Sequence, residues 1–260
     1  GTMFDFIPDK YTKVGIDPAD DSFLRESEKK ADFVVQDFFS AEAYKSTPYG
    51  RIKPKIITTI AMFYDLDDPW PFVQDIKEIL DDDGIWVMQL SYTPLMLKQL
   101  AFDNICHEHI CYYSLSSLKY LMDRAGFDIV DCSLNDTNGG SFRVYLMKKG
   151  ADKTKFRNQQ KRDVANFRVE SILAYEESLK LNDPKVYTDF YNQICELRQK
   201  TVDFITQQKA SGKTIWGYGA STKGNTLMQW YGLDNSHIDA IAERSEYKFG
   251  LLTAGTNIPI

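Results

Sequence analysis

The sequence predicts an α/β protein, with a doubly wound parallel sheet first and the beginning of a second α/β unit last. Apolar runs at 13–17, 31–37 and 54–61 each lead into a polar loop, which is typical of parallel strands buried on both faces. Segments of helical character separate these runs, and strand and helix alternating at this spacing indicate a doubly wound sheet. A strand, turn and helix pattern begins again at Lys213.

The elements up to residue 150 follow from local patterns. Residues 70–80 place Phe72, Ile76 and Ile79 on one helical face, and 85–92 is a fourth apolar strand. Next comes a helix, which we expect to begin at Ser114 or Ser116 and to end at Gly126. The last two predicted strands of this part, which form its antiparallel end, are 127–134 and 141–147, joined by the turn 135–140.

The second half changes character at about residue 151. Residues 152–210 are polar and helix-prone, with an interruption at 182–184, so we interpret them as a helical connector. A strand at 214–219, a helix at 223–231 and a strand at 237–243 follow. Two strands bury a helix poorly, so this last unit looks incomplete. The predicted domains are therefore 1–150, 151–211 and 212–260.

Composition excludes several classes of protein. The 260 residues are 43% hydrophobic and 26% charged, which is ordinary for a globular protein. No apolar run reaches the length of a membrane span, and the first residues lack the pattern of a signal peptide, so we expect a cytoplasmic protein without a membrane partner. The net charge of −6 and the lack of a basic stripe argue against a nucleic-acid partner. The four cysteines form no CxxC pair, so no structural metal site is expected.

Acidic residues end two of the predicted strands. Asp17 could accept hydrogen bonds from both hydroxyls of a ribose, and Asp37 could contact an adenine amino group. Asp17 could equally cap a turn before Pro18. A glycine-rich turn should precede such a carboxylate by roughly twenty residues, but only sixteen precede Asp17. Either the first strand and its turn lie upstream of residue 1, or the sheet binds no nucleotide.

Two further segments carry chemically capable residues. Cys106, His107, Glu108 and His109 offer a general base and a carboxylate beside it, although a metal site or a plain surface loop would also fit. In an extended segment His107 and His109 would share one face. The turn 217–225 follows an apolar strand and opens a helix, so its amides and a lysine could hold a phosphate, or it could be a tight turn without a ligand.

Four ordered motifs together carry a family resemblance. They are CHEHICYYS (106–114), NDTNGGSFRVYL (135–146), GYGASTKGNTL (217–227) and KFGLLTAGTNIPI (248–260). With them the sequence resembles the sugar C-methyltransferases, which methylate carbon 3 of nucleotide-linked 4-keto-6-deoxy sugars. The resemblance implies a Rossmann-like class I methyltransferase sheet, a helical connector and a partial second Rossmann-like domain. It also implies truncation at both ends, because members carry an N-terminal zinc module and a longer C-terminus. Gly1 and Thr2 match the tail of the glycine-rich turn, although a cloning scar would explain them too.

The resemblance also implies roles for individual residues. His109 would be the base that forms an enolate, with Glu108 and His107 orienting it or contacting the sugar. The cofactor would be S-adenosylmethionine (SAM), bound at Asp17, Asp37, Phe38, Ala61 and Met62. The substrate, a nucleotide-linked sugar, would be bound at Tyr64, Asn138, Gly140, Ser141, Arg143, Gly219, Ser221, Lys223 and Asn225.

Two positions depart from the family pattern. Cys106 stands where we expect a tyrosine, and Ala61 stands where we expect an asparagine, so the contacts that hold the keto sugar or the enolate would differ from those of the family. A module that binds a nucleotide sugar without catalysis is the alternative. A dehydrogenase that holds a dinucleotide at 217–225 is a third, although its GxGxxxxG spacing is not the usual fingerprint.

Overall fold

The structure is a computed structural model that describes residues 1–260, apart from the side chain of Ser22. The chain forms two compact units. The first consists of Gly1–Leu90, Ser117–Ser133 and Arg143–Glu170, and the second of Ser91–Ser116, Leu134–Phe142 and Ser171–Ile260. Among the described residues, no helix combines the length and the apolar character needed to cross a bilayer.

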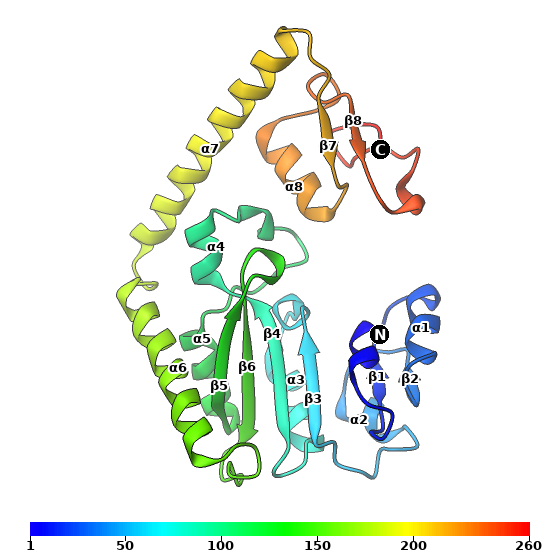
Figure 1. The fold of residues 1–260 in the computed structure, drawn as a ribbon, viewed down its shortest axis with the longest axis vertical. Coiled ribbons are helices and arrows are strands. Elements are labelled where there is room, and N and C mark those ends of the chain that lie inside the picture. Colours follow the sequence, from blue (N-terminus) through cyan, green and yellow to red (C-terminus); the bar gives the residue numbers. More distant parts are fainter. The chain divides into compact units, whose positions relative to one another are not determined.

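Figure 1 shows the elements in chain order. Up to residue 100 they are η1 (Thr2–Phe6), β1 (Val14–Ile16), α1 (Asp21–Glu28), β2 (Phe33–Val35), α2 (Ala41–Lys45), β3 (Ile56–Ile60), η2 (Phe63–Asp65), α3 (Pro69–Ile79), β4 (Ile85–Ser91) and α4 (Thr93–Gln99). After residue 100 they are η3 (Phe102–Asn104), α5 (Leu115–Ala125), β5 (Phe127–Asn135), η4 (Thr137–Gly139), β6 (Ser141–Lys148), α6 (Gln159–Ser178), α7 (Pro184–Ala210), β7 (Trp216–Tyr218), α8 (Thr222–Tyr231), β8 (Ala240–Ala242) and η5 (Glu246–Lys248).

The strands of the first part fall into two sheets. β1 and β2 form a parallel pair in which Gly15 lies opposite Val34, and a separate four-stranded sheet has the order β3-β4-β6-β5. β3 and β4 are parallel, with Ile57 opposite Trp86. The two sheets share a small core, because Tyr44 and Ile79 pack with residues of β1 and β3. Within the described residues, no strand joins β1 to β3, so the single sheet that the sequence predicts is interrupted there.

Aromatic side chains fill the core beside the four-stranded sheet. Trp86 of β4 is fully buried, and its ring lies 6.1 Å from that of Phe63 and 5.5 Å from that of Phe127. Phe72 of α3 lies 5.8 Å from Phe63. The Trp86 indole also donates a 3.1 Å hydrogen bond to Thr59 Oγ1 on β3, so the buried N–H has a partner. Phe72 and Ile76 of α3 are therefore both buried in this core, as their helical spacing in the sequence predicts.

The last part of the second unit is a small α/β motif. β7 and β8 are parallel, with α8 between them in the chain, and Gly217 lies opposite Ile241. Ile238, Ile241 and Ile258 form its core, against which residues of α7 and α8 pack. The segment that ends the chain contributes because Ile241 N donates to Pro259 O at 2.8 Å. Two strands thus bury their helix with help from α7 and residues 251–260.

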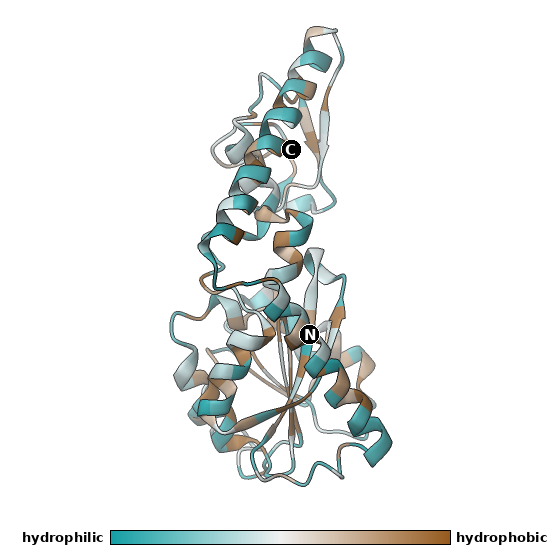
Figure 2. Cartoon of the chain, turned by 90° about the vertical axis from the view of Figure 1, so that its left-hand side faces the viewer, coloured by the Kyte–Doolittle hydropathy of each residue, from teal (hydrophilic) through white to brown (hydrophobic). Residues whose placement is uncertain are grey.

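The structure confirms the predicted α/β class and most of the elements, and it adds some. The segment 152–210, predicted to be helical, forms α6 and α7. Figure 2 shows hydrophilic residues along much of α7, whose buried side chains include Phe190 and Ile194. The short helices α4 and η3 have no counterpart in the sequence prediction. Gly1 and Thr2, which match the tail of a glycine turn, lie instead at the start of η1.

Candidate functional site

The loops after β1 and β2 lie together, because neighbouring parallel strands end at the same edge of a sheet. Asp17 directly follows β1, and its backbone N–H donates to Val35 O at 3.0 Å. The Asp17 carboxylate accepts a 3.0 Å hydrogen bond from Ala19 N, which is the turn-capping bond considered above. The Gln36 amide ties the loops together by donating to Ala19 O at 3.1 Å.

Asp37 and Phe38 follow β2 in the same region. Both side chains are exposed, Phe38 to 76%. The Asp37 carboxylate accepts a hydrogen bond from the N–H of Phe38 at 2.7 Å. An exposed carboxylate and an exposed ring at a sheet edge can contact a ligand without rearrangement of the core.

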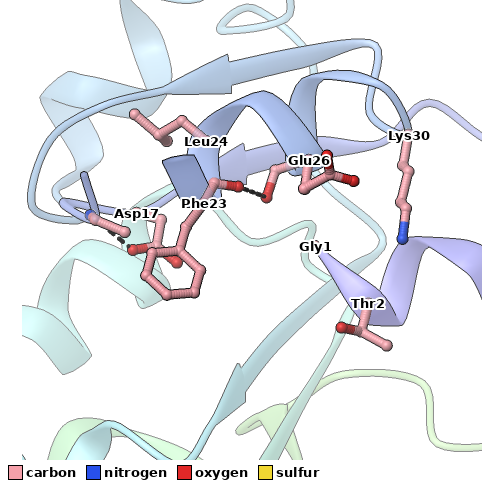
Figure 3. A pocket seen from close by; sticks show the side chains of 9 residues that line it. Gly1, Thr2, Asp17, Phe23, Leu24, Glu26 and Lys30 are labelled. Atoms are coloured by element: carbon pink, nitrogen blue, oxygen red, sulfur yellow. Dashed lines mark hydrogen bonds between the residues drawn. The ribbon is translucent and has the colours of Figure 1, made fainter. Parts of the chain in front are cut away.

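A pocket of about 420 Å³ lies beside Asp17. It is lined by Gly1, Thr2, Asp17, Ala19, Phe23, Leu24, Glu26, Ser27 and Lys30. Figure 3 shows Asp17 and Phe23 toward one side of the pocket and Lys30 toward the other. Lys30 is paired with Asp5 at 2.7 Å, and Glu26 is paired with Lys29, which lowers the pKa of Glu26. The Asp17 side thus combines a carboxylate with an exposed aromatic ring, Phe23.

The loop after β3 contains the other residues predicted to bind the cofactor. Ala61 directly follows the strand with φ of +54°, a left-handed conformation that is unfavourable for alanine, and its N–H donates to Gln89 O at 2.9 Å. Met62 follows it at the start of η2, and Tyr64, predicted to bind the substrate, is buried. Strained backbone at a strand end is often found at functional sites.

Arg143 of β6 is bound to Gln89 of β4. The Gln89 side-chain oxygen accepts hydrogen bonds from Arg143 Nε at 3.1 Å and from Nη2 at 2.7 Å. Gln89 is buried, whereas Arg143 is exposed. The glutamine holds the guanidinium in place, and the exposed part of that group keeps further N–H donors.

Residues 107–109, the HEH run, form a turn and not the extended segment considered in the sequence analysis. His109 N donates to Cys106 O at 3.2 Å, so the chain reverses at His107 and Glu108. The His107 and Glu108 side chains are exposed, with 3.9 Å between His107 Nε2 and Glu108 Oε1, and His109 is half-buried. The three residues therefore share one turn, in which His109 is more buried than the two residues before it.

Asn104 and Tyr112 close the base of this turn. The Tyr112 hydroxyl donates to Asn104 O at 3.3 Å, and burial is the main cause that raises the pKa of Tyr112. Asn104 is 3% exposed. Its amide donates to Ala101 O at 3.0 Å, and its side-chain oxygen accepts from Lys223 Nζ at 2.6 Å.

The turn between β5 and β6 is held by its backbone. Asn138 has φ of +53° and is exposed. Gly140 has φ of +122°, and a Cβ there would lie 2.7 Å from the Leu95 side chain, so only glycine fits. Gly140 O accepts from Tyr92 N at 3.1 Å, and the buried Ser141 hydroxyl donates to Thr137 O at 2.8 Å. Asn138 is exposed, so a ligand can reach its side chain.

The turn after β7 opens onto α8. Gly219 has φ of +92°, Ser221 caps α8 by accepting from Gly224 N at 3.0 Å, and Glu243 accepts from Ala220 N at 2.7 Å. Hydrogen bonds from the backbone N–H groups of Ser245, Ala220 and Arg244 lower the pKa of Glu243. The Asn225 Oδ1 atom is buried and has no hydrogen-bond partner within the part of the chain that the structure describes.

The predicted site residues therefore fall into two groups. Those predicted to bind the cofactor lie in the first unit, as do Tyr64 and Arg143, whereas the HEH turn, residues 138–141 and the turn after β7 lie in the second. Within the second unit Lys223 is hydrogen-bonded to Asn104, at the base of the HEH turn. Asn104 is the residue that the sequence analysis missed, and no local pattern marks it. The described residues include no group of three His, Cys, Asp or Glu side chains that could hold a metal ion.

Comparison with known proteins gives two family matches. Residues 2–131 match the family model described as methyltransferase domain, and residues 136–260 match the C-methyltransferase C-terminal domain. A curated relative, the C-methyltransferase NovU of Streptomyces niveus, is 28% identical over 247 residues, which is 95% of this chain. The chain spans 56% of the length of that relative.

Solved structures resemble the chain more distantly. A SAM-dependent methyltransferase of Thermotoga maritima, described as a possible histamine N-methyltransferase, matches with a TM-score of 0.40 at 16% identity, covering 53% of this chain and 73% of its own. A SAM-dependent methyltransferase of Aquifex aeolicus has a TM-score of 0.40 at 12% identity, covering 56% of this chain and 74% of its own. The family match over residues 2–131 extends over half of the sequence, so the chain belongs to the methyltransferase domain family, with the Rossmann-like α/β fold that the resemblance implies.

Proposed function

We propose that the protein is a SAM-dependent C-methyltransferase that acts on a nucleotide-linked keto sugar. The observation that carries the proposal is the similarity to a C-methyltransferase over 95% of the chain. The match of residues 136–260 to a C-methyltransferase C-terminal domain supports it. A substrate of this kind would place the enzyme in the cytoplasm.

The proposed chemistry uses the HEH turn. A ketone acidifies the neighbouring C–H bond, and an imidazole can accept the proton, so His109 removes it and an enolate forms. SAM, when bound, supplies an electrophilic methyl group, to which the new C–C bond forms as the S–CH₃ bond breaks. His107 and Glu108 orient the base or contact the sugar; their exposure in the turn leaves both able to reach a ligand.

The proposed cofactor site lies at the carboxyl ends of β1 and β2. Asp17 would accept hydrogen bonds from the ribose, and Asp37 and Phe38 would contact the adenine. The pocket beside Asp17 supports this placement because it combines a carboxylate with the Phe23 ring. The loop after β3, with Ala61 and Met62, would contact the rest of the cofactor.

Two sets of residues are proposed to bind the substrate. Tyr64, Asn138, Gly140, Ser141 and Arg143 would hold the sugar. The turn after β7 would hold the diphosphate through its amides and through Gly219, Ser221, Lys223 and Asn225. The start of α8 supports this assignment. Ser221 accepts the Gly224 N–H, and the N–H groups of Thr222 and Lys223 precede the first intrahelical bonds and would be left for the diphosphate.

The test of the base is His109→Gln in the full-length enzyme, assayed for methyl transfer. We expect a loss of at least about 100-fold in kcat, the usual contribution of a general base. The matched control is His237→Gln, because His237 lies in the second unit and bonds to Asp234 at 2.9 Å, away from the HEH run in sequence. Methyl transfer at a near wild-type rate in His109→Gln would remove His109 as the base.

The test of the cofactor site is calorimetric titration of S-adenosylhomocysteine into this chain and into a version extended upstream. The free edges of β1 and β3 support an additional parallel strand between them, followed by the glycine turn that the sequence analysis expects upstream of residue 1. We expect binding to the extended chain alone. Binding to neither version, together with affinity for a nucleoside diphosphate, would favour a nucleotide-sugar-binding module without catalysis.

A further inference from the structure

Lys223 is bonded to the protein and not simply directed to solvent. It lies in the first turn of α8, and its ammonium donates a 2.6 Å hydrogen bond to the side-chain oxygen of Asn104. The two residues are 119 positions apart in the sequence. A hydrogen bond in which the donor is charged is roughly twice as strong as a neutral one. The contact is therefore a defined link between α8 and η3.

A second, apolar contact fastens the same two elements. Phe102, the first residue of η3, is 5% exposed, and its ring lies 6.3 Å from that of Trp230 and 5.9 Å from that of Tyr231, both on α8. Phe190 and Ile194 of α7 belong to the same cluster. Phe102 thus anchors one end of η3 by packing, and Asn104 anchors the other end by its polar contact with Lys223.

Asn104 also contacts the segment that follows the HEH turn. Its backbone oxygen accepts the Tyr112 hydroxyl, which closes the turn, and its side-chain amide donates to Ala101 O at 3.0 Å. Within the turn, the His109 N–H donates to Cys106 O at 3.2 Å. Exposed turns with few contacts open easily. The position of His109 therefore depends on how firmly Asn104, at the base of the turn, is held.

We propose that Lys223 is a positioning residue for the HEH turn and acts on it through Asn104. In this role the ammonium fixes the Asn104 side chain, Asn104 fixes the base of the turn, and the turn holds His109 in place for proton removal. The inference rests on the proposed function only for the role of His109. The linkage between α8 and the turn is a property of the ligand-free protein and can be measured without turnover.

The first experiment is hydrogen exchange of the amides of residues 105–112 in this chain without ligands. We expect Lys223→Met to speed their exchange several-fold, and Asn104→Ala to do the same. The double variant should add little to either single one, because both changes break the same link. The control is Lys213→Met, the same change at a lysine of the second unit whose ammonium contacts Gln208. Unchanged exchange at 105–112 in Lys223→Met would overturn the proposal.

The second experiment separates positioning from ligand binding in the full-length enzyme. A lysine that positions the base affects the transition state, so Lys223→Met should lower kcat about 10-fold, in addition to the rise in KM that loss of its proposed diphosphate contact would cause. Lys223→Arg keeps a charged donor and should recover part of the loss. A raised KM with unchanged kcat would show that Lys223 only binds the substrate. If exchange changes as expected but the full-length protein without substitutions transfers no methyl group, the link between α8 and the turn stands and the proposed function fails.

Discussion

The Tyr92 hydroxyl donates a 2.8 Å hydrogen bond to the Glu176 carboxylate, and both side chains are buried. Glu176 also accepts from the backbone N–H groups of Leu115 and Ser116, at 2.6 and 2.8 Å. These are the first amides of α5, and a negative charge is favourable at the N-terminus of a helix. Thr93, next to Tyr92, donates from both its N–H and its hydroxyl to Tyr113 O. The segment that follows the HEH turn is therefore fixed at residues 113–116.

We expect Glu176→Ala to lower the free energy of unfolding by about 3 kcal/mol, because it leaves a buried hydroxyl and two helix amides without their acceptor. Glu176→Gln, which keeps an acceptor but loses the charge, should cost about half as much. Urea unfolding measures both values. Glu177→Gln is the control, since Glu177 is the exposed neighbour on the same helix. A loss in Glu176→Ala no larger than that in the control would contradict the role of Glu176 as a cap.

Replacement of Ala61 by glycine should stabilise the folded protein. Its φ of +54° is a conformation that costs an alanine about 1–2 kcal/mol, and its side chain is exposed, so no packing is lost. The greater freedom of unfolded glycine offsets part of the gain. We expect Ala61→Gly to raise the free energy of unfolding by about 0.5–1 kcal/mol.

The matched control for Ala61 is Ala43→Gly in α2. Ala43 lies inside a helix, so glycine should lower the free energy of unfolding there by about 1 kcal/mol. Opposite signs for the two substitutions, measured by urea unfolding, would confirm that backbone conformation is the cause. Destabilisation by Ala61→Gly would mean that the strain is smaller than the entropy that glycine adds to the unfolded chain.

Local patterns could predict the elements but not the contacts between them. The apolar runs locate β1, β3 and β4 to within a few residues, and the spacing of Phe72 and Ile76 predicts α3, because burial on one face needs that spacing. The HEH run could be identified as chemically capable, but a single hydrogen bond to Cys106 O decides that it is a turn. The Lys223–Asn104 pair spans 119 positions, and neither residue has a local pattern that shows its partner.

The turn at residues 234–237, before β8, should contribute less to the stability of the folded protein in acid. Hydrogen bonds from the Ser236 side chain and backbone, and then from His237, lower the pKa of Asp234 to about 2 from an ordinary value of 3.8. A carboxyl whose pKa is lower in the folded state stabilises it above the unfolded pKa, and this contribution is lost as the pH falls through the folded pKa. We expect the loss between about pH 4 and pH 2.

The measurement for Asp234 is a carboxyl NMR titration, combined with urea unfolding at pH 5 and pH 3. Asp234→Asn should lower stability at pH 5 and should reduce the difference between the two pH values. Asp203→Asn is the control, because Asp203 is an exposed carboxylate on α7 that contacts a neutral glutamine, Gln199. An Asp234 carboxyl that titrates near pH 4 in the folded protein would contradict the prediction.

Asp131 holds α6 against β5 in the first unit. Its carboxylate is 3% exposed and accepts from Arg168 at Nε and Nη2, at 3.0 and 2.7 Å, and it also pairs with Arg157. Removing one partner of a buried pair costs about 3–5 kcal/mol, but both arginines are partly exposed and can regain water. We therefore expect Asp131→Asn to lower the free energy of unfolding by about 3 kcal/mol, the lower end of that range.

Arg168→Lys tests the geometry of the same contact. Lysine keeps the charge but cannot form the paired hydrogen bonds, so it should cost about 1 kcal/mol, clearly less than Asp131→Asn. Urea unfolding of the two variants gives the order. Arg162→Lys is the control, since Arg162 lies on the same helix and contacts Gln159 at the surface. Equal losses in Arg168→Lys and Asp131→Asn would mean that the paired geometry of the guanidinium, and not the burial of the carboxylate, determines the contribution of this contact to stability.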